Sequence, residues 1–183
     1  MRSAARTAMA AIFCCIMSAA CTKQAQETKY GKQEETIEKF VQQQTSKFND
    51  ARVVYQGGAV RIVLSEGEGV ELSARGSAVI RYAGYDFSKG SMSANSMFAT
   101  NDRSLAESVG WFVNDSTAWE PMRISLSDKD VVPGLAKGMV GMKKGEEAII
   151  LFSGKYGFGK HGLGMIPADA ALAYQLIIED LEN

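Results

Sequence analysis

Hydrophobic residues recur at helical spacing near the start of the chain. Four large apolar residues share one face of a helix over residues 33–50, because a period of 3.6 residues aligns positions three and four apart: Ile37, Phe40, Val41 and Phe48. Glu34 and Glu35 fall in the first turn, where the helix dipole favours negative charge. We therefore predict an amphipathic helix over 33–50 that docks on a domain core and carries no chemistry.

From residue 51 onward the hydrophobic period changes to two, which is typical of β-strands. Apolar runs or alternations of strand length occupy residues 60–64, 78–82, 148–152 and 172–178. Gly57-Gly58 is expected to supply one hairpin turn, and Gly67 with Gly69 another. These strands predict an antiparallel sheet.

Two short helices are expected between the strands. One is predicted over residues 100–110, where Ser104 and Glu107 have the spacing of a capping box. The other starts at Pro133, since proline is well tolerated at the first helical position. Few helices and many antiparallel strands predict an α+β domain.

The first 21 residues have the order of a secretory signal. Two arginines precede an apolar run over residues 8–17, and small residues and Cys21 follow it. The run is too short for a bilayer, which takes about 20 apolar residues. Small residues directly before a cysteine resemble the lipobox of bacterial lipoproteins, in which that thiol is diacylated, although Ser18 stands in place of the usual leucine.

This resemblance gives expectations for processing and location. We expect a lipoprotein signal peptide over residues 1–20, lipidation of Cys21, and a polar tether over residues 21–32. A lipid holds a protein to a membrane without a spanning helix, so the expected location is the bacterial cell envelope, at the outer membrane or facing the periplasm. Ordinary signal cleavage, with Cys21 incidental, is the alternative.

Composition narrows the classes of function. A chain of 183 residues with 46% hydrophobic and 22% charged residues is typical of a folded soluble domain. The net charge of −1 disfavours nucleic acid as a partner, because binding to phosphates needs an excess of basic side chains. All three cysteines fall in the first 21 residues and His161 is the single histidine. The rest of the chain is therefore expected to form no disulfide, no thiolate metal site and no cluster of imidazoles.

A dinucleotide-binding reading is disfavoured. Residues 157–162 match G-x-G-x-x-G, but that fingerprint must open a helix, and here Pro167 and a final strand follow. No known motif joins a serine, histidine and aspartate as a nucleophilic catalytic set. The acidic residues are scattered singly, so their spacing does not indicate a pair of catalytic carboxylates.

A series of short motifs follows in the C-terminal half of the chain: Val131-Val132-Pro133-Gly134-Leu135, Gly138-Met139, Met142-Lys143-Lys144-Gly145-Glu146, Ala148-Ile149-Ile150-Leu151-Phe152, Tyr156-Gly157-Phe158-Gly159, Ile166-Pro167 and Ala171-Leu172-Ala173-Tyr174. In order and spacing they resemble FKBP-type peptidyl-prolyl cis-trans isomerases. Residues 67–84 resemble the first strands of that family. The resemblance implies a curved antiparallel β-sheet wrapped over a short helix across residues 51–183, with a long insertion around 86–120.

The resemblance also implies an apolar pocket between the sheet and the short helix. Three of its residues are implied to act in catalysis: Tyr82, Val132 and Phe158. Seven are implied to bind substrate: Phe98, Met122, Ile124, Val131, Leu135, Ile166 and Tyr174. An X–Pro bond rotates over a barrier of about 18–20 kcal/mol because of amide resonance. A dry pocket weakens that resonance and needs neither metal nor cofactor.

Two positions depart from the family's pattern. Ala99 stands in place of an acidic residue, and Phe158 in place of a tyrosine. Each lost hydrogen bond corresponds to about 0.5–1.5 kcal/mol, or roughly threefold to tenfold. We expect weakened isomerase activity that assists the folding of exported, proline-containing polypeptides. The alternative is a non-catalytic FKBP-like binding module or folding helper in an envelope complex.

The insertion is rich in aromatic residues, namely Trp111, Phe112 and Trp119. They either widen the surface at the mouth of the pocket, since exposed aromatics mark interaction sites, or pin a long loop to the domain.

Overall fold

The computed structural model describes residues 2–47, 51–114 and 119–183, and the side chains from residue 24 onward. The chain forms two units, one up to Lys32 and one over Gln33–Asn183. Helix α1 (Arg2–Lys47) accounts for the first and continues into the second. The helix predicted over 33–50 is thus the end of a longer one, which also includes the residues expected as a tether.

Two expectations for the N-terminal region fall partly outside the described part of the chain. The side chain of Cys21 is one of them, and residues 48–50 are the other. Within the described residues, no helix combines the length and the apolar character needed to cross a membrane.

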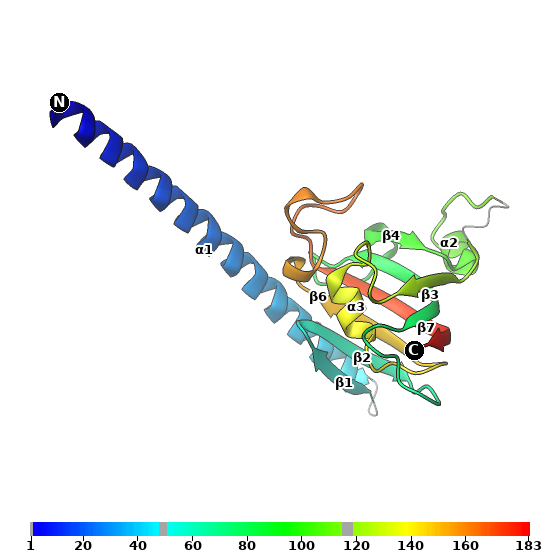
Figure 1. Ribbon diagram of the computed structural model, residues 1–183. Helices are drawn as coiled ribbons and strands as arrows, with labels where there is room; N and C mark the ends of the chain where they lie inside the picture. Colours follow the sequence, from blue (N-terminus) through cyan, green and yellow to red (C-terminus); the bar gives the residue numbers. More distant parts are fainter. Residues whose placement is uncertain (1, 48–50, 115–118) are drawn as a thin grey trace. The chain divides into compact units, whose positions relative to one another are not determined.

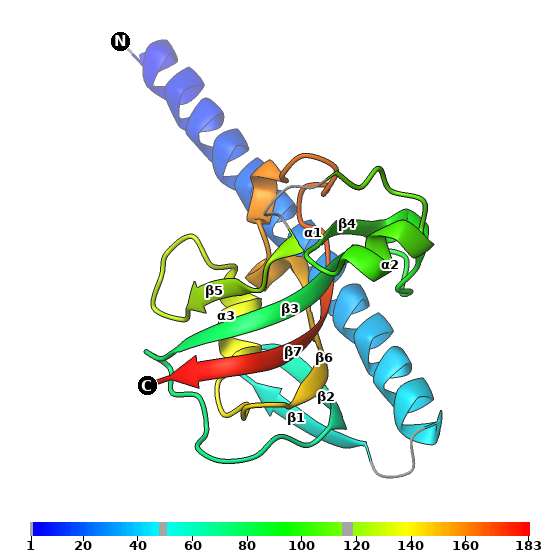
Figure 2. The same cartoon turned by 90° about the vertical axis from the view of Figure 1, so that its right-hand side faces the viewer.

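Residues 33–183 are built on a seven-stranded antiparallel sheet (Figure 1). The strand order is β1-β2-β6-β7-β3-β4, and β5 pairs with β3 beside β4. The strands are β1 (Arg52–Gln56), β2 (Ala59–Ser65), β3 (Ser77–Asp86), β4 (Met97–Thr100), β5 (Met122–Ser125), β6 (Glu147–Phe152) and β7 (Leu172–Glu182). Figure 2 shows the long β3 and β7 running side by side, with β4 and β5 following one another along the outer edge of β3. This arrangement leaves a break in the ladder between β4 and β5.

Of the two hairpins predicted from pairs of glycines, one is formed and the other is not. Gly57 and Gly58, at φ 59° and 90°, join β1 to β2 as predicted, because a tight hairpin turn of this type needs positive φ at both central residues. The hairpin predicted at Gly67 and Gly69 is wrong, since β6 and β7 lie between β2 and β3 in the sheet. Alternation identifies strands but does not say which strands pair.

Helix α2 (Arg103–Ser108) lies within the predicted range of 100–110 but has a different cap. The carboxylate of Asp102 accepts the backbone N–H of Leu105 at 3.1 Å. The capping box predicted from Ser104 and Glu107 is therefore wrong. Aspartate caps a helix as well as serine does, and it stands two positions earlier.

The sheet carries a hydrophobic core on each face. Along β6 the side chains of Ala148, Ile150 and Phe152 join the core under α3 (Pro133–Met139), whereas Ile149 and Leu151 join a core with Ile37 and Val41 of α1. Successive side chains of a strand point to opposite faces, so a continuous apolar run marks a strand buried on both. We call these the α3 face and the α1 face.

A buried ion pair holds α3 on its face. Arg61 of β2 and Glu146, just before β6, approach to 3.3 Å between Nε and Oε1, and their side chains are 4% and 0% exposed. Arg61 also donates to the carbonyl oxygens of Gly138 and Val140 at 2.9 Å each, where α3 ends and its carbonyls lack helical partners. Burial lowers the pKa of Arg61 and raises the pKa of Glu146. No periodicity in the sequence marks this pair.

Candidate functional site

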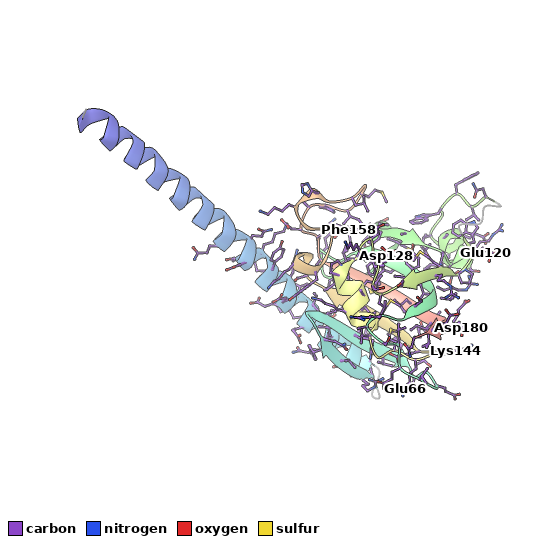
Figure 3. All side chains as sticks on the ribbon, viewed as in Figure 1. Glu66, Glu120, Asp128, Lys144, Phe158 and Asp180 are labelled. Atoms are coloured by element: carbon purple, nitrogen blue, oxygen red, sulfur yellow. The ribbon has the colours of Figure 1, made fainter. Side chains whose placement is uncertain are left out.

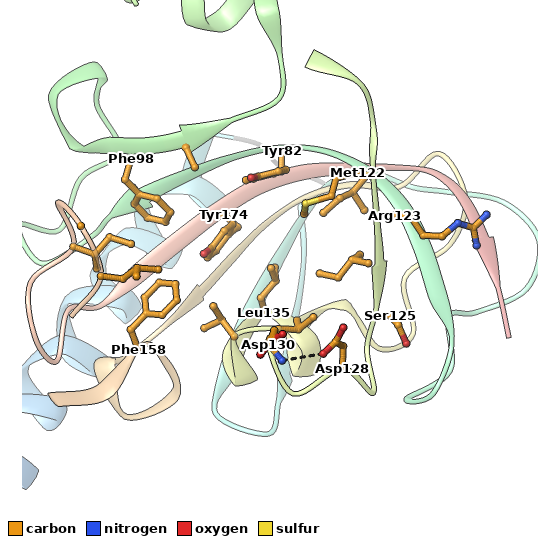
Figure 4. Close-up of a pocket in the computed structure, with 18 of the residues that line it drawn as sticks. Tyr82, Phe98, Met122, Arg123, Ser125, Asp128, Asp130, Leu135, Phe158 and Tyr174 are labelled. Atoms are coloured by element: carbon orange, nitrogen blue, oxygen red, sulfur yellow. Dashed lines mark hydrogen bonds between the residues drawn. The ribbon is translucent and has the colours of Figure 1, made fainter. Parts of the chain in front are cut away.

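A pocket of about 510 Å³ opens on the α3 face. Its walls come from the strands β3, β4, β5 and β7, from α3 and the loop before it, and from residues 154–169 between β6 and β7, which we call the flap (Figure 4). All ten residues predicted for the site line this one pocket: Tyr82, Phe98, Met122, Ile124, Val131, Val132, Leu135, Phe158, Ile166 and Tyr174. The functional role of each residue remains a prediction.

Aromatic rings form the inner wall. The ring of Tyr174 on β7 lies 6.2 Å from that of Tyr82, 5.8 Å from that of Phe98 and 6.0 Å from that of Phe152, measured between centroids. A side chain at Gly84 would meet the ring of Phe98 at 2.7 Å. The absence of a side chain there gives the rings their room, and Figure 4 shows Phe98 and Tyr174 projecting into the pocket.

The two tyrosines of this wall bring polar groups into a largely apolar space. Burial raises the pKa of both Tyr82 and Tyr174, so both phenols are neutral near pH 7. A neutral phenol can donate or accept a hydrogen bond, and both side chains border the space that a ligand would fill.

Asn101 fixes the backbone of Tyr82 and was not found by sequence reasoning. Its Oδ1 accepts the Tyr82 N–H at 2.8 Å, and its Nδ2 donates to the carbonyls of Ile80 and Glu120 at 2.9 and 3.1 Å. The side chain is buried and fills the break between β4 and β5. A single asparagine after a strand ordinarily predicts a turn. The sequence around Asn101 therefore does not indicate that its side chain bonds to the backbone of β3.

Small residues let α3 lie close to the sheet. A Cβ on Gly134 would stand 2.2 Å from the ring of Phe152, and one on Gly138 would stand 2.3 Å from Ile150. Both distances are far below van der Waals contact. The close approach places Leu135 as the floor of the pocket, buried against the sheet (Figure 4).

The start of α3 presents a backbone donor at the pocket. Val132 is the N-cap residue and Pro133 is the first residue of the helix, as predicted. Within the described part of the chain no backbone acceptor takes the Val132 N–H. This N–H is available to a carbonyl oxygen of a bound peptide.

The rim of the pocket holds residues that the sequence did not indicate. Polar or charged side chains line it from β5 and the loop that follows: Arg123, Ser125, Asp128 and Asp130. The carboxylate of Asp128 accepts the Asp130 N–H at 3.0 Å (Figure 4). Leu163 and Met165, which line the pocket from the flap, are exposed.

The two departures from the family's pattern both lie in the pocket. Ala99 and Phe158 both line it. The carboxylate and the phenol hydroxyl expected at these two positions are therefore absent from the pocket wall.

The aromatic residues of the insertion do not line the pocket. Trp111 packs against the core of the α1 face, Phe112 is 90% exposed, and Trp119 donates from Nε1 to the carbonyl of Asn114 at 2.9 Å. Residues 115–118 of the insertion are outside the described part. The packing of Trp111 favours the interpretation that this side chain pins the loop to the domain, whereas the hydrogen bond of Trp119 lies within the insertion.

The glycine-rich segment forms short 3₁₀ turns. One spans Gly154–Tyr156 and the next Gly159–His161, and no α-helix follows among the described residues. The phosphate-binding geometry of a strand followed by a helix N-terminus is therefore not formed here. In the described part of the chain, no group of three or more histidine, cysteine or acidic side chains could hold a metal ion.

Comparison with known proteins agrees with this geometry. Residues 104–178 match the family model of the FKBP-type peptidyl-prolyl cis-trans isomerases. The chain is 35% identical over 57 residues to the FK506-binding protein 1B of Aspergillus fumigatus, covering 31% of this chain and 48% of the relative. It is 33% identical over 58 residues to the FK506-binding protein 1 of Yarrowia lipolytica, covering 31% and 54%. The chain thus matches about half the length of these curated relatives.

A solved structure extends the likeness of the fold over most of the chain. The peptidyl-prolyl cis-trans isomerase of Pseudomonas syringae superposes with a TM-score of 0.56 and 17% sequence identity. The match covers 86% of this chain and 96% of that one. The predicted fold, an antiparallel sheet with a short helix and a preceding N-terminal helix, is confirmed.

Proposed function

We propose that this chain, whose residues 104–178 match the family model of the FKBP-type peptidyl-prolyl cis-trans isomerases, is a member of that family and accelerates rotation about X–Pro bonds in polypeptides. One observation carries the proposal: ten residues from separate segments line one apolar pocket. The family is a class of enzymes, and its substrates are proline-containing chains.

The pocket supports a mechanism based on removal of water. A proline ring would lie between Tyr82, Leu135 and Tyr174, with Phe158 closing the space from the flap. Water stabilises the planar, charge-separated form of the prolyl amide, and that form opposes rotation. An apolar wall replaces this water and favours the twisted form. The Val132 N–H would hold a neighbouring carbonyl oxygen in place during the rotation.

The activity is expected to be weaker than that of a family member with both polar groups. At Ala99 no carboxylate orients the substrate, and at Phe158 no hydroxyl does. The hydroxyls of Tyr82 and Tyr174 remain in the pocket. The same two substitutions favour the second candidate, a binding module of the same fold that holds proline segments without significant turnover.

The proposed setting is the bacterial cell envelope. Arg2, Arg6 and the apolar run over residues 8–17, followed by Cys21, support a lipoprotein signal. A lipid on Cys21 would anchor the protein while the domain meets exported, unfolded chains. Expression of the full chain in a bacterial host tests this. Labelling by a palmitate analogue that is lost in Cys21→Ser is the expected result, and unlabelled wild-type protein would refute the anchor.

The isomerase proposal is tested with a tetrapeptide containing Leu-Pro in a protease-coupled assay. The wild-type chain is expected to accelerate isomerisation, and Leu135→Lys, which places a charge on the pocket floor, is expected to abolish that effect. Val70→Ala is the matched control, since Val70 is 66% exposed and does not line the pocket. Peptide binding without acceleration would select the binding module. Neither binding nor acceleration would refute both candidates.

A further inference from the structure

The flap supplies one whole wall of the pocket but makes few contacts at its tip. Phe158, Leu163, Met165 and Ile166 all reach the pocket from it. The tip is closed by a pair of hydrogen bonds between the backbones of Leu163 and Ile166, at 3.0 and 2.9 Å. Leu163 is 60% exposed and Met165 is 74% exposed. The two stems by which the flap leaves the sheet therefore contribute to the position of this wall, together with the packing of Ile166 and Phe158 against the core of the α3 face.

One side chain from outside the flap joins both stems. Gln33, in helix α1, donates from Nε2 to the carbonyl oxygen of Asp169 at 2.7 Å. Its Oε1 accepts the backbone N–H of Gly154 at 2.9 Å. Gly154 opens the flap directly after β6, and Asp169 closes it shortly before β7. A primary amide is suited to this task, because it offers a donor and an acceptor side by side.

The two stems meet in a geometry that needs such support. A Cβ on Gly154 would stand 2.2 Å from the carbonyl oxygen of Asp169, so the backbones touch. Asp169 has a φ of 55°, the one positive value at a described residue other than glycine. Left-handed backbone is less favourable than right-handed for residues other than glycine, although aspartate tolerates it better than most. The hydrogen bond from Gln33 Nε2 holds the Asp169 carbonyl while its backbone has this conformation.

Helix α1 is itself a fixed point at this place. One and two turns beyond Gln33, Ile37 and Val41 are buried in the core of the α1 face. The ring of Phe40 meets that of Phe87 edge-on at 5.1 Å between centroids. The carboxylate of Glu34 also accepts the hydroxyl of Ser153 at 3.2 Å. The amide of Gln33 is thus held by a packed helix and does not swing freely.

We infer that Gln33 is a positioning residue that clamps the stems of the flap and thereby sets the place of Phe158 and Ile166 across the pocket from Leu135. This inference rests on the proposed function, because a clamp on the flap matters for binding only if the pocket receives a peptide. Gln33 does not line the pocket and acts through the flap alone. It makes the N-terminal helix part of the peptide-binding machinery.

The test uses the full chain with Gln33→Ala, Gln33→Glu and, as matched control, Gln43→Ala, an exposed glutamine of the same helix. Amide hydrogen exchange, affinity for a Leu-Pro tetrapeptide and thermal unfolding are measured for each. Gln33→Ala is expected to lose protection of the Gly154 amide and to bind peptide about threefold to tenfold more weakly, as the loss of one net hydrogen bond implies. Gln33→Glu keeps the acceptor for the Gly154 N–H. It replaces the donor to the Asp169 carbonyl by a carboxylate oxygen, so that hydrogen bond is lost and two acceptors face each other. It is expected to retain Gly154 protection while weakening peptide binding.

Two results would overturn the inference. One is unchanged peptide affinity in Gln33→Ala although the Gly154 amide has lost protection, because the stems then do not set the pocket. The other is a loss of protection spread evenly over the sheet together with a lowered melting temperature, which would mean a general structural role. If the wild-type chain binds no peptide, the proposed function fails, and the clamp is then judged on exchange in residues 154–169 alone, with wild-type exchange in Gln33→Ala refuting it.

Discussion

The two faces of the sheet are built from the same strands but differ in how a helix covers them. On the α1 face, Ile37 and Val41 of the helix close the core together with Phe87 and Leu151. On the α3 face, a helix of seven residues covers part of the sheet and leaves a pocket of about 510 Å³ beside it. The long helix covers its part of the α1 face and leaves only a smaller pocket of about 270 Å³ beside Ala83 and Tyr85, whereas the short helix leaves the larger space beside it.

The α3 face therefore needs other means to stay in place. Buried charges and glycine contacts hold α3 where packing is incomplete. Arg61, which pairs with Glu146, ties the C-terminal end of α3, and Gly134 and Gly138 let the helix approach the sheet. Substitutions on one face at a time should therefore separate the contributions of the two faces.

The largest effect is expected at the buried pair. Glu146→Ala leaves the guanidinium of Arg61 buried without its counter-charge, which costs about 3–5 kcal/mol of unfolding free energy. Chemical denaturation measures the change. Glu66→Ala is the control, because Glu66 pairs with Arg52 at the surface (Figure 3), and such pairs contribute about 0–1 kcal/mol. Equal losses of unfolding free energy in the two variants would show that burial does not strengthen the contribution of the Arg61–Glu146 pair.

A truncation on each face compares the cores directly. Ile37→Ala is expected to lower the unfolding free energy by about 2–5 kcal/mol, because it opens a cavity in a filled core. Leu135→Ala is expected to cost less, since Leu135 already borders the pocket. Peptide affinity should follow the opposite order and fall further in Leu135→Ala, since Ile37 acts on the pocket only through the helix that carries Gln33. A larger stability loss for Leu135→Ala would contradict the contrast between the faces.

Restoring the two absent polar groups is expected to act on the α3 face alone. Ala99→Asp together with Phe158→Tyr should raise the isomerisation rate by roughly threefold to tenfold for each hydrogen bond regained. The protease-coupled assay measures the gain, and each single variant serves as a control. A double variant no faster than wild type would mean that these positions do not orient substrate.

The smallest effect is expected at alkaline pH. Burial raises the pKa of Tyr174 and Tyr82 above their unfolded value near 10. A raised pKa contributes stability that is complete below pH 10 and is lost as the pH rises through the folded value, by at most about 1.4 kcal/mol per pH unit for one group. Denaturation curves from pH 8 to 11 should be shallower in their pH dependence for Tyr174→Phe than for wild type. An unchanged dependence would show that this phenol titrates normally.

The sequence predicted what is periodic or carried by a contiguous motif. The helix face of Ile37 and Val41, the Gly57-Gly58 hairpin and the start of α3 at Pro133 are of this kind, and they were confirmed. The ten pocket residues were found through the likeness to a family, and the structure brings all of them together.

What the sequence did not predict is held by hydrogen bonds between distant positions. Asn101 bonds to Ile80, Gln33 to Asp169, and Arg61 to Gly138. Each is a single polar residue whose partner lies far along the chain, so no spacing rule connects the two. Their roles follow only once the strand order is known, and the false hairpin at Gly67 shows that alternation alone does not give that order.

The account's central claim is that the α3 face, and not the α1 face, receives the proline ring. Methyl chemical shifts during titration of the full chain with a Leu-Pro peptide test it most directly. We expect shifts at Ile124, Leu135 and Ile166, which line the pocket, and none at Ile37, Val41 and Ile149 of the opposite core. Shifts confined to the second group, or absent from both, would contradict the account.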